Sequence, residues 1–147
     1  MNFKRIVLII LPILVLLIAI GSSVFKITKR SPINVINLGF EINLPEPDSY
    51  IFNKSNRGIH GDGELVIIVK YNENLDLQEF NLSTAEQVSE VIKNDIYFDE
   101  NEKNEVLNIF DIFSSECEHY SYQYDNKSLY ISFNRQDNTY LIIALYF

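Results

Sequence analysis

The residues best suited to chemistry lie in one glycine-rich stretch, Gly58-Ile59-His60-Gly61-Asp62-Gly63-Glu64. If this stretch is extended, His60, Asp62 and Glu64 project to one face, because successive side chains of a strand point to opposite faces. One imidazole and two carboxylates could hold a divalent cation or perform acid–base chemistry. Three ligands are too few to specify a metal, and no second motif supplies the others, so we predict no cofactor.

The same stretch is also typical of a turn. Asp-Gly is a preferred pair in tight hairpins, because glycine adopts positive φ without strain. In this interpretation His60 and Glu64 flank the turn in solvent, and three glycines form it: Gly58, Gly61 and Gly63. We prefer the turn and keep the metal or catalytic site as the alternative.

A second candidate is the pair Cys117 and His119, which share one face if they lie on a strand. Side chains at i and i+2 stand about 6–7 Å apart, too far for the hydrogen bond of a nucleophile and its base. A zinc site would need two further ligands. We therefore expect a buried thiol and an exposed imidazole.

Two further sets of residues carry weaker signals. One is acidic: Asp95, Asp99, Glu100, Glu102 and Glu105. It lacks the spacing and the turn glycine of a calcium loop, so it predicts a solvated loop. The other is aromatic: Tyr120, Tyr122, Tyr124 and Tyr130. These tyrosines could form a surface for a peptide or a sugar, but we expect them to pack in the core.

The elements that position these residues predict one α+β domain. Alternation at Leu38, Phe40, Ile42 and Leu44 indicates a strand, and a hairpin is expected from Tyr50-Ile51-Phe52 through the glycine-rich turn into Leu65–Val69. A capping box at Ser83-Thr84-Ala85-Glu86 opens a helix that runs to about residue 94, and a second helix is expected over 102–114. Alternating residues from 120 to 133 and an apolar run at 140–147 complete a mainly antiparallel sheet of five or six strands, covered on one side by one or two helices.

An apolar run without charge at positions 6–25 precedes this domain. Its length suits a transmembrane helix, and its short basic N-terminal tail favours a signal-anchor that leaves the rest of the chain outside the cell. We predict a membrane anchor at 1–27, a connector at 28–32 and a domain at 33–147. The alternative is a cleaved signal peptide and a secreted protein, because small residues stand at Ala19-Ile20-Gly21.

The domain is strongly acidic. Five of the 12 basic residues lie in the first thirty positions, which hold no acid, so residues 31–147 carry seven bases against 20 acids and a net charge of −13. Phosphate backbones would repel such a domain, so nucleic-acid binding is excluded as a function class. The charge would instead attract cations or a basic partner.

The combination of an apolar anchor, the pair Leu44-Pro45 and the HGDGE turn resembles small uncharacterised membrane-anchored proteins of Gram-positive bacteria. This resemblance implies an architecture and a location, and it implies no activity. From the residues themselves we expect a non-enzymatic domain that binds a protein or an envelope component, as an accessory, sensor or immunity-type factor. The alternative is a membrane-anchored hydrolase or metal-dependent enzyme that uses His60, Asp62 and Glu64.

Overall fold

Six strands form one antiparallel sheet in the order β1-β2-β6-β5-β4-β3. The computed structural model describes residues 31–57, 62–110 and 116–147. The strands are β1 (Ser49–Arg57), β2 (Gly63–Lys70), β3 (Asn81–Leu82), β4 (Cys117–Tyr124), β5 (Lys127–Asn134) and β6 (Thr139–Tyr146). The predicted α+β class is therefore confirmed, and so are the hairpin β1–β2 and the meander β4–β5–β6.

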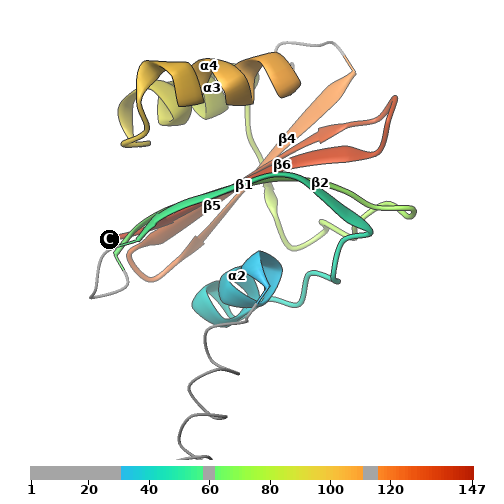
Figure 1. The fold of residues 1–147 in the computed structure, drawn as a ribbon. Coiled ribbons are helices and arrows are strands. Elements are labelled where there is room, and N and C mark those ends of the chain that lie inside the picture. The colour runs from blue at the N-terminus through green and yellow to red at the C-terminus, as the bar shows by residue number, and fades with distance from the viewer. Residues whose placement is uncertain (1–30, 58–61, 111–115) are drawn as a thin grey trace, which may run out of the picture. The chain divides into compact units, whose positions relative to one another are not determined.

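Helices cover both faces of this sheet (Figure 1). The helices are α2 (Pro32–Phe40), α3 (Ala85–Asn94) and α4 (Glu100–Ile109). α2 packs on one face with the odd-numbered side chains of β2, and α3 and α4 pack on the other face with the even-numbered ones. The expectation of helices on one side only was wrong, because β2 and β6 are buried on both faces and each face needs its own cover.

The first segment of the domain is a helix, and the predicted strand over 38–44 was wrong. Ile33, Ile36 and Phe40 are at most 1% exposed and stand three and four residues apart, which is the spacing of one helix face. Pro32 suits the first helical position, where no amide donor is needed. After the helix, the side chain of Asn37 exchanges two hydrogen bonds with the backbone of Leu44, at 2.7 and 2.8 Å. The helical spacing of Ile33, Ile36 and Phe40 therefore decides the structure of this segment, and the alternation that begins at Leu38 does not.

The other two helices begin close to the predicted positions but with different caps. Thr84 caps α3 in a capping box with Gln87, one residue later than the predicted pair of Ser83 and Glu86. α3 ends at Asn94, as predicted. α4 begins at Glu100 behind Asp99, which caps it together with Glu102, so the expected acidic loop is partly helical. The two-residue strand β3 was not predicted.

In the part of the chain that the structure describes, no helix is both long enough and apolar enough to cross a membrane. The predicted anchor at positions 6–25 lies outside that part.

Candidate functional site

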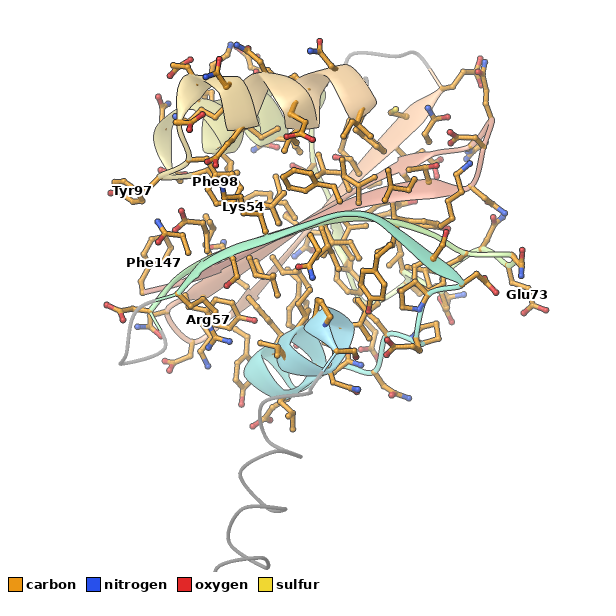
Figure 2. The ribbon with its side chains drawn as sticks, viewed as in Figure 1. Lys54, Arg57, Glu73, Tyr97, Phe98 and Phe147 are labelled. Carbon is orange, nitrogen blue, oxygen red and sulfur yellow. The ribbon has the colours of Figure 1, made fainter. Side chains whose placement is uncertain are left out.

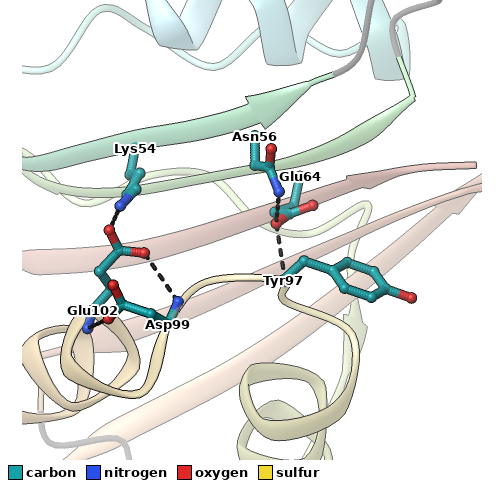
Figure 3. A network of polar contacts seen from close by, with 6 residues as sticks. All are labelled: Lys54, Asn56, Glu64, Tyr97, Asp99 and Glu102. Atoms are coloured by element: carbon teal, nitrogen blue, oxygen red, sulfur yellow. Dashed lines mark hydrogen bonds and ion pairs between the residues drawn. The ribbon is translucent and has the colours of Figure 1, made fainter.

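Of the two charged residues of the predicted HGDGE site that the structure describes, Asp62 is exposed and Glu64 lies in the interior. It is the second residue of β2, pairs with Leu145 of β6 and is 2% exposed. Its Oε1 accepts hydrogen bonds from Nδ2 of Asn56 at 3.1 Å and from the backbone N–H of Tyr97 at 3.0 Å (Figure 3). The expectation that Glu64 flanks a turn in solvent was therefore wrong, because the α3–α4 connection covers it.

That connection presents Tyr97 to solvent. Ile96 and Phe98 are 2% and 7% exposed and belong to the core between the sheet and the helices α3 and α4, whereas Tyr97 between them is 78% exposed. The bond from Tyr97 N–H to Glu64 fixes the backbone at the point where the side chain turns outward. A buried carboxylate thus orients an exposed aromatic ring.

A second polar network holds the other end of the connection (Figure 3). Lys54 of β1 forms an ion pair with Glu102, and its Nζ lies 5.2 Å from the centroid of the Phe98 ring. Glu102 also accepts from the backbone N–H of Asp99 at 3.1 Å, within the α4 capping box. Strand β1 therefore anchors the first turn of α4, and the connection is fixed on both sides of Tyr97.

Glu64 and Tyr97 line a hollow of about 260 Å³, which we call the Glu64 hollow. Figure 2 shows Tyr97 and Phe147 at the same end of the sheet. Both rings are well exposed, at 78% and 65%. Eight residues line the hollow: Asp62, Gly63, Glu64, Asp95, Tyr97, Leu145, Tyr146 and Phe147. The hollow therefore combines three carboxylates, an apolar floor and two exposed aromatic rings.

The structure brings together two of the three predicted site residues. Asp62 is exposed and lines the same hollow as the buried Glu64. His60 lies outside the described residues, as do Gly58 and Gly61. The expectation that Gly63 lies in the turn was wrong. Gly63 is the first residue of β2, where it pairs with Arg57 and Tyr146 and has a φ of 119°.

The carboxylates of the hollow do not converge on a point. Across ranges 31–57, 62–110 and 116–147, no three His, Cys, Asp or Glu side chains lie close enough together to hold a metal ion. Asp95, Tyr97 and Phe147 were not predicted as site residues. The sequence did contain a signal for the burial of Glu64, because this residue shares a strand face with the buried Val66 and Ile68.

The second candidate pair, Cys117 and His119, lies on β4 and is at least half-buried. His119 is 8% exposed, and its Nδ1 lies 2.9 Å from Oγ of Ser132, which is opposite it on β5. Cys117 is half-buried and packs against the core below α3 and α4. The expectation of an exposed imidazole was wrong, because the partner hydroxyl allows the ring to be buried.

The four tyrosines do not form one surface. Tyr120, Tyr122 and Tyr124 pack against the core below α2, whereas Tyr130 packs against the core on the opposite face of the sheet. All four are partly buried and pack against the edge of the core, so the prediction that they pack in the core is confirmed only in part. Burial raises the pKa of Tyr130, and the nearby Asp95 raises it further.

A larger cavity, of about 500 Å³, lies near the turn that precedes β6. Its charged residues, Glu118 and Arg135, form an ion pair with each other. Glu118 also accepts from the hydroxyl of Tyr120 at 3.0 Å. Because these charges are already satisfied, this cavity offers a ligand less than the Glu64 hollow does.

Comparison of the chain with models of known protein families, with curated proteins and with solved structures found no match.

Proposed function

We propose that this chain is a membrane-anchored protein whose acidic domain lies outside the cell and binds a positively charged protein or envelope component without transforming it. The observation that carries this proposal is the Glu64 hollow. It combines a carboxylate that is 2% exposed with two exposed carboxylates and two exposed aromatic rings. Carboxylates and aromatic faces both attract cations.

The charge of the whole domain supports the same kind of partner. With −13 over residues 31–147, the domain attracts a basic surface over several ångströms and accelerates the encounter with it. The aromatic rings then supply contact area, because exposed tyrosine and phenylalanine bury a large apolar surface on binding. Long-range attraction and short-range packing thus favour one class of partner.

The contacts of Glu64 also favour a role in binding over a role in proton transfer. The two groups that hold its Oε1 are a backbone N–H and an asparagine amide. Neither group exchanges protons readily near neutral pH, so they fix the carboxylate in place and do not relay a proton. A rigid, negatively charged acceptor is suited to recognition.

Photocrosslinking in living cells tests the proposal. The variant Tyr97→p-benzoylphenylalanine places the crosslinker at the rim of the hollow. Leu82→p-benzoylphenylalanine is the matched control, because Leu82 is 81% exposed and lies on β3, at the opposite edge of the sheet. We expect a discrete adduct at Tyr97 that is absent at Leu82, with the crosslink mapped beside lysine or arginine residues of a protein, or beside an amine-bearing envelope component. The same adducts at both positions, or none at Tyr97, would contradict the proposal.

A further inference from the structure

The carboxylate of Glu64 is only half satisfied. Both of its side-chain hydrogen bonds end on Oε1, and Oε2 has no donor among the described residues. In Figure 3 this second oxygen points to the side on which the Tyr97 ring lies. Oε2 is not fully buried, because the fully buried side-chain oxygens without a partner among the described residues belong to Ser89, Thr139 and Tyr146. It therefore faces the solvent of the hollow, where a cationic donor can replace water and form a charge-assisted hydrogen bond.

The number of free oxygens distinguishes between the two basic side chains. Arginine binds carboxylates best through two parallel hydrogen bonds, one to each oxygen. At Glu64 the first oxygen already receives two donors, so only one oxygen is open. Lysine presents a compact ammonium that needs a single acceptor and neighbouring negative charge, which Asp62 and Asp95 provide.

The size and the walls of the hollow fit a lysine stem. A volume of about 260 Å³ lies below the roughly 300–1,000 Å³ that is usual for small-molecule sites, so it suits one side chain better than a whole ligand. Leu145 offers an apolar floor, and the exposed rings of Tyr97 and Phe147 stand at the rim. Lysine buries its methylene stem against such surfaces while its charged end finds a polar partner.

We propose that the Glu64 hollow binds the side chain of a lysine from a partner protein, with the ammonium donating to Oε2 of Glu64. This inference rests on the proposed function, and it specifies the chemical group that the domain recognises. The neighbouring carboxylates contribute attraction, and the rings of Tyr97 and Phe147 pack against the stem.

Titration by two-dimensional NMR of the ¹⁵N-labelled full chain in a non-ionic detergent tests this proposal. The probe is a blocked pentapeptide with a central lysine between glycines. Three comparison probes are the same peptide with norleucine, the same peptide with arginine, and n-butylamine. We expect the lysine peptide to shift the amide signals of Glu64, Asp95 and Tyr97, and to bind at least about tenfold more tightly than the norleucine and arginine peptides. Because n-butylamine carries the same stem and ammonium, it should shift the same signals.

Three variants identify the group that is responsible. Glu64→Gln keeps a carbonyl oxygen for the donors of Asn56 and Tyr97 but places an N–H where Oε2 stood, so we expect binding at least about tenfold weaker. Glu73→Gln removes the same charge at the other end of the molecule (Figure 2), and we expect less than a twofold change. Tyr97→Ala changes a side chain that is 78% exposed, and it should also weaken binding.

Several results would overturn the inference. Equal binding of the lysine and norleucine peptides would show that the ammonium is not recognised, and equal losses in Glu64→Gln and Glu73→Gln would show only a general charge effect. Tighter binding of the arginine peptide, or signal shifts with n-butylamine but none with the lysine peptide, would assign the hollow to another ligand. If the lysine peptide fails while Tyr97→p-benzoylphenylalanine still captures a basic partner, this inference is wrong and the proposed function stands. If both experiments fail, both are wrong.

Discussion

Replacing Glu64 with alanine tests how much its buried carboxylate stabilises the domain. The change removes the acceptor of two hydrogen bonds, one from a backbone N–H and one from a side-chain amide. A hydrogen bond to a charged group contributes about 1.5–3 kcal/mol, but Asn56 is exposed and water can replace its acceptor. We therefore expect Glu64→Ala to lower the free energy of unfolding by about 2–3 kcal/mol, most of it from the Tyr97 N–H.

Urea unfolding of the full chain provides the measurement, followed by far-UV circular dichroism and tyrosine fluorescence, because the sequence holds nine tyrosines and no tryptophan. Two variants serve as controls. Glu64→Gln retains a carbonyl acceptor and should cost less than about 1 kcal/mol, and Asn56→Ala removes only the exposed donor and should also cost less than about 1 kcal/mol. The double variant Glu64→Ala with Asn56→Ala completes a cycle that isolates their interaction.

Two outcomes would refute this reasoning. If Glu64→Gln is as destabilising as Glu64→Ala, the negative charge matters and a neutral acceptor for the two hydrogen bonds is not enough. If Glu64→Ala costs less than about 0.5 kcal/mol, water from the hollow replaces both bonds, and the carboxylate does not hold the α3–α4 connection.

Three further predictions concern the domain as a whole. Ile142→Ala should lower the free energy of unfolding by about 2–5 kcal/mol in urea melts, because the side chain is fully buried in β6, whereas Leu38→Ala, at a side chain 62% exposed, should change it by less than about 1 kcal/mol. Burial, followed by the nearby Tyr50 and Glu46, raises the pKa of Tyr71 well above its ordinary value of 10.0. The unfolded chain therefore loses this proton at a lower pH than the folded one, so the contribution of Tyr71 to stability is fully present below about pH 10 and is lost as the pH rises above it. Tyr71→Phe should make the fall in stability above about pH 10 less steep, and an unaltered slope would contradict the assignment. Gly63→Ala should destabilise the β1–β2 hairpin by about 1–3 kcal/mol, because its φ is positive and the new Cβ would clash with the carbonyl oxygen of Asn56. A thermal melt equal to that of the wild type would exclude this strain.

The strands were predictable because short stretches of sequence show which of their faces are buried. Leu129, Ile131 and Phe133 alternate with polar residues, and the runs at 65–69 and 140–146 are apolar on both faces. A strand that is apolar on both faces needs cover on both faces. Helices on both faces of the sheet could therefore have been predicted from the sequence, and the prediction of helices on one side only did not take this into account.

The segment at 33–44 shows where a local pattern misleads. Phe40 belongs to two patterns at once, the alternation with Leu38 and Ile42 and the helical spacing with Ile33 and Ile36. Only the helical spacing places all the large side chains of α2 except Leu38 on the sheet side. An alternating and a helical pattern that share residues cannot be separated without knowing where the core lies.

The candidate site was predictable only in part. The alternation of β2 places Glu64 on the same face as Val66 and Ile68, so its burial could have been inferred from the sequence. One of its two donors, the backbone N–H of Tyr97, lies 33 residues further on, and its position depends on how α3 packs against the sheet. Contacts at that separation arise from tertiary packing and carry no local sequence signal.

The position of β6 has a consequence for how the domain is made. β6 is the last of the strands in chain order, yet it lies between β2 and β5 and is buried along its whole length. While a ribosome synthesises the chain from the N-terminus, β2 and β5 each keep an unpaired edge until residues 139–146 have emerged. The sheet therefore cannot form strand by strand during translation. Its central pairing joins segments far apart in the sequence, which makes folding slow and exposes apolar edges to association until the last strand is inserted.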